Sequence, residues 1–268
     1  MTATITLSNQ RAGAGGTGAQ TVRRATLLLR LIASAGRDGC RLIDLAMQSG
    51  LERPTAHRIL RCLIEEGMVT QSPATRRYHL GQLAFELGLA AVPRVDLRQL
   101  CEGALLRIAE RTGDTVFLTV RSGYDSVCLD RKEGAFPIRT LTLDVGTRRP
   151  LGVGAGGMAL LMPLTDVEIA AILAANAARI PGYANLDGAA VTGMIERARR
   201  IGYVLNDRQI TPGATSVGLP VPNPYGPPFA AVSLGAINSR MTPERQREIA
   251  AVLRSEVAGV QRLLRGTA

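Results

Sequence analysis

The stretch from Leu42 to Gly67, LIDLAMQSGLERPTAHRILRCLIEEG, decides the fold of the first part of the chain. Its apolar spacing predicts two short helices, Leu42–Gln48 and Pro54–Glu66, separated by a Ser-Gly turn. Pro54 favours the first turn of the second helix, where its missing N–H costs nothing, and Gly67 is typical of a position just beyond a helix. Two short helices joined by a tight, glycine-containing turn indicate a helix-turn-helix.

The residues on either side of this stretch predict a winged helix. Apolar residues from Val22 to Ile32 recur at helical spacing and form a supporting helix that ends near Gly36. Residues 68–70 and 76–80 flank a turn and predict a small β-hairpin, the wing. We expect a disordered tail over residues 1–20, a winged helix-turn-helix DNA-binding domain over 21–81, a linker helix over 82–95, and a second domain over 96–268.

The positive charge of the chain gathers in this first part. The 268 residues carry a net charge of +10, and Lys132 is the only lysine. Residues 1–80 hold 11 arginines against 5 acids, whereas the rest is nearly balanced. A basic excess on a helix-turn-helix favours double-stranded DNA as partner. The candidate DNA-binding residues are Arg53, Thr55, His57, Arg58 and Arg61 on the second helix, and Arg76 and Arg77 on the wing.

These residues have two possible roles on DNA and one away from it. Arginine can pair bidentately with guanine, or it can hold a phosphate and carry no sequence information. A solvated helix face and a solvated hairpin are the alternatives that need no DNA.

Residues 96–268 alternate predicted helices and strands. Asp96 is a plausible cap for the first helix, and Thr165-x-x-Glu168 is a capping box that opens another, to about Ala178. Further helices are expected over residues 191–200 and from Thr242-Pro243 to Arg265. Strands are expected over residues 115–121, 126–130, 138–143, 217–221 and 229–237. This order indicates an α+β fold with an antiparallel sheet flanked by helices.

The second part lacks the residues of most catalytic sites. Both histidines, His57 and His79, lie in the first 80 residues, so neither a Ser-His-Asp arrangement nor a histidine-ligated metal site can form beyond them. The four cysteines form no CxxC pair, and no apolar run is long enough to span a membrane. We therefore expect a cytoplasmic protein without cofactor or metal that is not an enzyme. Carboxylate-only chemistry remains an alternative.

Glycines 152, 154 and 157 match the spacing of a dinucleotide-binding loop, but Arg148-Arg149-Pro150 before them is not an apolar strand. A Gly/Ala-rich start of a short helix can still present free N–H groups to an anion. Close packing of the helix on a sheet explains the glycines equally well. Asn206, Asp207, Ser216 and Ser233, at or near expected strand ends, either line a ligand pocket or are ordinary strand-end polarity.

Taken together, these pieces resemble the isocitrate lyase regulator (IclR) family of bacterial transcription regulators over nearly the whole chain from Thr21. The resemblance rests on residues 22–25, 42–46, 50–51, 55–60, 63, 67 and 78–81 in the first part, and on residues 113–116, 145–151, 154–157, 202–203, 213, 220–221 and 231–234 in the second. It implies a winged helix, a linker helix, and a GAF-like domain that binds a small effector, often an organic acid or aromatic metabolite. It also implies homodimers that pair into homotetramers, and an effector pocket lined by Ala155, Gly156, Asn206, Ser216 and Ser233.

The chain departs from the family pattern at Met158, where lysine is usual, at Asn206-Asp207, where an acidic run is usual, and at Gly235, where serine is usual. Fewer acids and hydroxyls indicate a bulkier or more apolar ligand as an alternative. We expect a DNA-binding transcriptional regulator whose operator affinity is controlled by a small molecule. The alternatives are a nucleic-acid-tethered, carboxylate-based enzyme in residues 96–268 and a purely structural DNA-binding oligomer.

Overall fold

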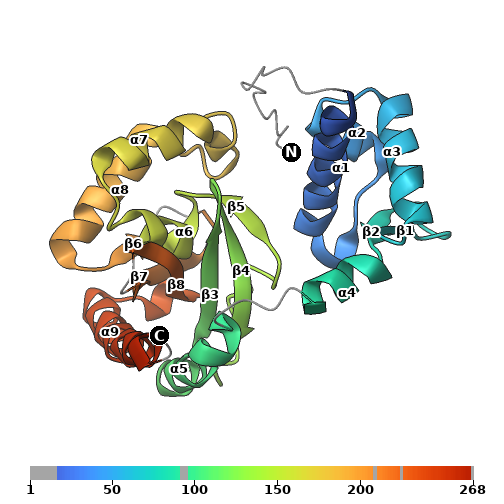
Figure 1. The fold of residues 1–268 in the computed structure, drawn as a ribbon. Helices are drawn as coiled ribbons and strands as arrows, with labels where there is room; N and C mark the ends of the chain where they lie inside the picture. The colour runs from blue at the N-terminus through green and yellow to red at the C-terminus, as the bar shows by residue number, and fades with distance from the viewer. Residues whose placement is uncertain (1–16, 91–95, 208–209, 224–225, 267–268) are drawn as a thin grey trace. The chain divides into compact units, whose positions relative to one another are not determined.

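The computed structural model describes residues 17–90, 96–207, 210–223 and 226–266 (Figure 1). The chain divides into two compact units, residues 1–94 and 95–268. Most of the expected tail, residues 1–16, and the end of the expected linker, residues 91–95, lie outside the described residues. The first helix begins at Thr17, so residues 17–20 are helical where we expected the tail to continue.

The first unit has three helices, a hairpin and a fourth helix. The elements are α1 (Thr17–Ser34), the 3-10 turn η1 (Gly36–Asp38), α2 (Leu42–Ser49), α3 (Arg53–Glu65), β1 (Val69–Gln71), β2 (Tyr78–Leu80) and α4 (Gln82–Ala90). Gly50 ends α2 with φ 65°, a left-handed conformation that glycine adopts without a steric cost. The antiparallel β1–β2 pair is the expected hairpin. Leu28, Ile32, Leu45 and Leu60 meet in the core.

The second unit is built on a six-stranded sheet in the order β5-β4-β3-β8-β7-β6, antiparallel at every pair. The strands are β3 (Thr115–Ser122), β4 (Asp125–Lys132), β5 (Arg148–Pro150), β6 (Val204–Asn206), β7 (Ala214–Asn223) and β8 (Gly226–Ile237). Because β5 runs antiparallel to β4, the glycines that follow it do not belong to a parallel βαβ unit. The dinucleotide-binding interpretation is thereby excluded on geometry as well.

Helices cover both faces of this sheet (Figure 1). The helical elements are α5 (Leu97–Thr112), α6 (Gly154–Leu161), α7 (Asp166–Ala175), η2 (Ile180–Gly182), α8 (Gly188–Ile201), η3 (Asn238–Arg240) and α9 (Pro243–Gly266). One core lies between the sheet and the pair α5 and α9, and a second joins α6, α7 and α8 to the opposite face. Within the described part of the chain, no helix is long and apolar enough to cross a membrane.

Local signals at the helix ends act as the sequence indicated. The Asp96 carboxylate accepts hydrogen bonds from the backbone N–H of Arg98 (3.0 Å) and of Gln99 (3.1 Å). Thr165 and Glu168 form the capping box of α7. These side chains satisfy N–H groups that the first turn of a helix leaves without a backbone partner.

The strand expected over residues 138–143 does not form. Residues 133–147, which we call the pocket loop, connect β4 to β5 without any helix or strand. Thr140, Thr142 and Leu143 line a pocket, whereas Ile138 and Leu141 are exposed, so these side chains do not alternate between two faces as they would in a strand.

Helix α6 lies unusually close to the sheet. A Cβ atom added to Gly156 would stand 2.6 Å from Thr119 Oγ1, and one added to Gly218 would stand 2.7 Å from the Ala155 carbonyl oxygen. Both distances are shorter than real Cβ contacts, so these positions require glycine. The expected close packing of a helix on the sheet is therefore present, and the N-terminal turn of α6 is held against the strands that form the pocket floor.

Candidate functional site

The first candidate site is the outer face of α3. His57, Arg58 and Arg61 are exposed and follow one another at helical spacing on one side, whereas Ala56, Ile59 and Leu60 of the same helix are buried. Arg53 is also exposed and Thr55 is partly exposed. Arg61 forms a 3.5 Å ion pair with Glu65, but both side chains are well exposed, so the pair contributes little and leaves Arg61 available.

The charges of α3 oppose the helix macrodipole. Arg53 is the first residue of the helix, no acidic residue occupies the first turn, and Glu65 is the last residue. The positive end of a helix favours acids, so Arg53 is placed unfavourably there, whereas Glu52 at the N-cap, just before it, is placed favourably. The helix start and the Arg53 guanidinium are both positive, which suits a phosphate.

The two wing arginines differ in their surroundings. Arg76 is exposed at the tip of the hairpin with φ 57°. Arg77 is partly buried, and its Nη1 donates hydrogen bonds to the carbonyl oxygens of Asp38 (3.3 Å) and Gly39 (2.9 Å). Arg77 therefore fixes the wing to the segment that precedes α2, whereas Arg76 has the exposure that a phosphate contact requires.

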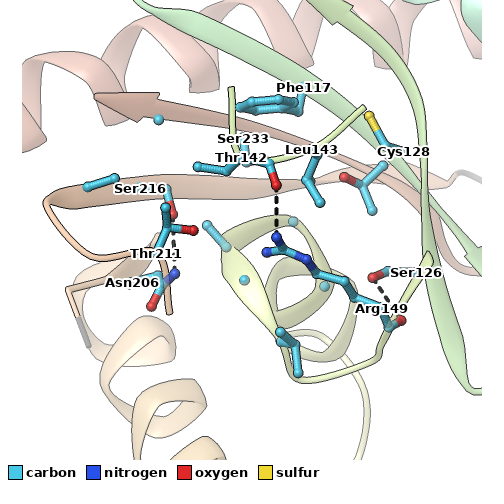
Figure 2. Close-up of a pocket in the computed structure, with 18 of the residues that line it drawn as sticks. Phe117, Ser126, Cys128, Thr142, Leu143, Arg149, Asn206, Thr211, Ser216 and Ser233 are labelled. Carbon is cyan, nitrogen blue, oxygen red and sulfur yellow. Dashed lines mark hydrogen bonds between the residues drawn. The ribbon is translucent and has the colours of Figure 1, made fainter. Parts of the chain in front are cut away.

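The second candidate site is a pocket between the sheet, the start of α6 and the pocket loop (Figure 2). Its cavity volume is about 40 Å³, and about 580 Å³ when the open space at its mouth is included. The five residues proposed for effector binding all line it: Ala155, Gly156, Asn206, Ser216 and Ser233. Nine lining residues carry hydroxyl groups: Thr119, Ser126, Thr140, Thr142, Thr147, Thr211, Thr215, Ser216 and Ser233.

The pocket is rich in hydroxyl groups despite the departures from the family pattern at the positions singled out in the sequence. Gly235 does lack a side chain where the family pattern has serine, but threonines from β3, β7 and the pocket loop supply hydroxyls that the sequence did not single out. None of the lining residues in the described part of the chain is Asp or Glu. The pocket is consequently polar and free of negative charge.

Arg149 is the one charged residue among the described residues of the lining, and sequence reasoning missed it. Its Nη2 donates a 2.8 Å hydrogen bond to the Thr142 carbonyl oxygen (Figure 2). Its guanidinium carbon lies 5.8 Å from the centre of the Tyr183 ring. Among the described residues, no carboxylate forms an ion pair with Arg149. Burial lowers the pKa of Arg149, because removing the guanidinium from water disfavours its charged form, yet an arginine remains protonated at neutral pH.

The start of α6 adds a second source of positive potential beside Arg149. Val153 precedes the helix and provides no side-chain cap, and no acid lies in the first turn. A Cβ added to Gly154 would lie 3.7 Å from Arg149 Nη1, so the guanidinium stands next to the helix start. Uncapped N–H groups and a cation without an ionic partner form a ready site for an anion.

Two buried polar atoms in the lining have no hydrogen-bond partner within the described structure. The first is Thr119 Oγ1, in a residue that is 3% exposed, and the second is Asn206 Oδ1, in a residue that is 6% exposed. Asn206 Nδ2 donates to Ser216 Oγ at 3.4 Å. An unpaired buried polar group costs about 1–3 kcal/mol, so such atoms call for a polar ligand or water.

Burial makes two of the cysteines poor nucleophiles. Cys101 and Cys128 are buried, and burial raises the pKa of both thiols to about 11, which keeps them protonated. Among the described residues, no cluster of His, Cys, Asp and Glu could hold a metal ion.

Comparison with known families accounts for both sites. A family described as "Bacterial transcriptional regulator IclR C-terminal" matches residues 89–262, which include every lining residue of the pocket. A second, described as "IclR helix-turn-helix domain", matches residues 21–73, which include α3.

The chain belongs to the IclR family of bacterial transcriptional regulators. It is a DNA-binding regulator with an N-terminal winged helix-turn-helix, and the fold expected from the sequence is confirmed. Among its IclR relatives, the HTH-type transcriptional regulator XynR of Escherichia coli (strain K12) is 29% identical over 223 residues, which are 83% of this chain and 88% of XynR.

Solved structures of IclR regulators share the fold. A putative IclR regulator from Silicibacter sp. TM1040 superposes with a TM-score of 0.76 at 25% identity, over 91% of this chain and 96% of that one. An IclR homolog from Microbacterium hydrocarbonoxydans, solved in complex with 4-hydroxybenzoate, gives a TM-score of 0.70 at 22% identity, over 92% of this chain and 99% of that one.

Proposed function

We propose that this IclR regulator binds a small organic acid, aliphatic or aromatic, in the pocket of its second unit, and that the acid changes its affinity for operator DNA. The observation that carries the proposal is the pocket itself, which combines an uncapped helix start, nine hydroxyls and no carboxylate among its described lining residues. A negatively charged ligand is favoured there by the helix dipole and by hydroxyl donors.

The DNA side of the proposal rests on α3 and the wing. The exposed residues Arg53, His57, Arg58 and Arg61 would face the major groove with Thr55, and Arg76 would reach the flanking backbone. Arg77 would act on DNA mainly through the position of the wing, because its guanidinium already holds two backbone carbonyls.

The symmetry of the DNA target calls for more than one copy of the chain. Two recognition helices in a homodimer would read half-sites about one helical turn, roughly 10 bp, apart or a multiple of it, and two dimers would form a homotetramer. As a regulator of a bacterial chromosome, the protein would act in the cytoplasm. An acid would bias the dimer between arrangements that fit the operator differently, a coupling of about 1–3 kcal/mol.

The proposal is tested by titrating operator DNA with the full-length protein at fixed salt, with and without candidate acids. The panel contains benzoate, 4-hydroxybenzoate and aliphatic acids of three to six carbons; 4-hydroxybenzoate is included because the Microbacterium relative was solved with it. At least one member should change operator affinity by about five- to 150-fold, the range of such couplings. The neutral amide of each acid is titrated in parallel, and no change in operator affinity with any acid or any amide would contradict effector control.

The same samples separate a regulator from an enzyme. We propose that the protein is not an enzyme, in keeping with the inert thiols and with the lack of histidine after residue 80. A bound acid should therefore be recovered chemically unchanged after long incubation. A converted ligand would favour the alternative of a carboxylate-based enzyme.

A further inference from the structure

The pocket loop, residues 133–147, is fixed at both ends. At its start, the backbone N–H of Gly134 donates to the Asp114 carbonyl (3.2 Å) and that of Phe136 to the Gly113 carbonyl (2.9 Å). At its end, the N–H of Gly146 donates to the Cys128 carbonyl at 2.8 Å. The ends therefore continue the framework of the sheet, and only the middle of the loop has room to move.

Arginine side chains hold the middle of the loop over the pocket. Arg149 Nη2 donates to the Thr142 carbonyl at 2.8 Å, and Arg131 Nη1 donates to the Leu143 carbonyl at 3.1 Å. Both acceptors are neutral carbonyls of adjacent residues. Removing one of these two bonds would loosen the part of the loop that covers the ligand space.

The two arginines differ in what else they contact. Arg131 forms ion pairs with Glu133 (3.1 Å) and Asp144 (2.9 Å), so its charge is already balanced. The sequence neighbour of Arg149, Arg148, is likewise paired with Asp125 at 3.1 Å. Arg149 lines the pocket and has no ion pair within the described residues, so its charge is the one in this group that a ligand can neutralise.

The position of Arg149 brings a bound anion into competition with Thr142. The guanidinium stands beside the start of α6, where a second positive potential attracts the same anion. A carboxylate can take two parallel N–H bonds from an arginine, and a charge-assisted bond is roughly twice as strong as one to a neutral carbonyl. The Thr142 carbonyl would lose this competition.

We propose that Arg149 is both the receptor for the anionic group of the effector and the latch of the pocket loop, so that binding of a carboxylate exchanges the Thr142 carbonyl for the ligand and frees the middle of the loop. This inference rests on the proposed effector function and sharpens it in two ways. The effector must be an anion rather than a neutral molecule of the same shape. Residues 137–143, which include the exposed Ile138 and Leu141, are the part of the unit that becomes more mobile when a ligand fills the pocket.

The receptor role is tested by calorimetric titration of the full-length protein with matched acid and amide pairs: benzoate and benzamide, 4-hydroxybenzoate and 4-hydroxybenzamide, and propanoate and propanamide. The wild type should prefer the acid of at least one pair by about ten- to hundredfold, the effect of bonds to a charged group. Arg149→Met should abolish this preference, and Arg149→Lys should keep part of it because the charge remains. Arg200→Met removes an exposed charge outside the pocket and should change nothing.

The latch role is tested by hydrogen exchange of peptides that cover residues 137–147. Saturating acid should raise exchange there in the wild type, and the matching amide should not. Arg149→Met should show the raised exchange without any ligand, with an unchanged circular dichroism spectrum as evidence that the fold is intact.

Several results would overturn the proposal, and they are distinct from failure of effector control. The proposal is wrong if no acid binds, if the acid preference survives in Arg149→Met, or if acid binds without raising exchange in residues 137–147. A neutral molecule that changes operator affinity while acids do not would leave effector control standing and remove Arg149 as its receptor.

Discussion

Replacing Gly156 with alanine tests whether α6 lies as close to the sheet as the pocket requires. The added Cβ would meet Thr119 Oγ1 at 2.6 Å, Thr119 Cβ at 3.0 Å and Ser233 Oγ at 3.4 Å. Threonine is β-branched and stiff at χ1, so its hydroxyl cannot swing away freely. Either α6 must rise from the sheet or the strand must shift, and both changes disturb the pocket floor.

The magnitude follows from comparison with a second helical glycine. Gly193 of α8 has no atom within 4 Å of an added Cβ, so Gly193→Ala should stabilise the protein by about 0.5–1 kcal/mol through helix propensity alone. Gly156→Ala gains the same propensity but pays for overpacking, about 1–3 kcal/mol. The difference between the two variants isolates the overpacking, and the short contact places it in the upper half of that range.

Urea unfolding followed by tyrosine fluorescence measures this difference, because four of the five tyrosines lie in residues 124–225. Thr119→Ala removes the clashing hydroxyl, which has no hydrogen-bond partner among the described residues, and should restore most of the stability lost in Gly156→Ala. Equal changes in the free energy of unfolding for Gly156→Ala and Gly193→Ala would show that α6 does not approach β3 this closely. The same conclusion would follow if Thr119→Ala did not restore the stability lost in Gly156→Ala.

Three further predictions concern other parts of the molecule. Arg58→Ala should weaken operator binding by about ten- to a hundredfold in a gel-shift titration without changing the melting temperature, and unchanged affinity would remove α3 as the recognition helix. Asp96→Ala should lower the free energy of unfolding by about 1 kcal/mol, because two N–H groups of α5 lose their acceptor; an unchanged urea midpoint would refute the cap. At pH 8 a thiol reagent should modify the exposed Cys62 and spare the buried Cys101 and Cys128. The pKa values of these two buried thiols, about 11, lie above the unfolded value near 9, so the free energy of unfolding should fall as the pH rises from 9 to 11.

Local signals carried most of the fold prediction. Gly50 permits the left-handed turn that ends α2, and Pro54 fixes φ in the first turn of α3; the predicted bounds of these helices differ from the observed ones by one residue. The 115–121 and 126–130 strands were found because their apolar residues are buried in the sheet. The strand predicted over residues 138–143 was wrong: the segment pairs with no strand, Thr140, Thr142 and Leu143 line a cavity, and the absence of a partner strand cannot be seen in the sequence of the segment itself.

The sequence predicted five uncharged residues that line the pocket, but it did not predict the charged one. The five proposed lining residues meet in the structure, whereas Arg149 went unnoticed beside Arg148. Alternation along a strand sends neighbouring side chains to opposite faces, so one of the pair had to face the pocket and the other the ion pair with Asp125. The pairing of β5 with β4 decides which of the two arginines faces the pocket and which one pairs with Asp125. A threonine inside an apolar strand, such as Thr119, was the available signal for a polar pocket floor.

The way the sheet ends has a consequence for how copies of the chain can assemble. Both edge strands, β5 and β6, are only three residues long, and β5 contains Pro150, which has no N–H to offer a neighbour. Where β4 extends beyond β5, it carries the partly exposed Arg131 and Lys132. Short, charged and proline-containing edges discourage the addition of a strand from another molecule. A strand from a second copy of the chain therefore gains little by pairing with either edge, and the six-stranded sheet ends within its own unit.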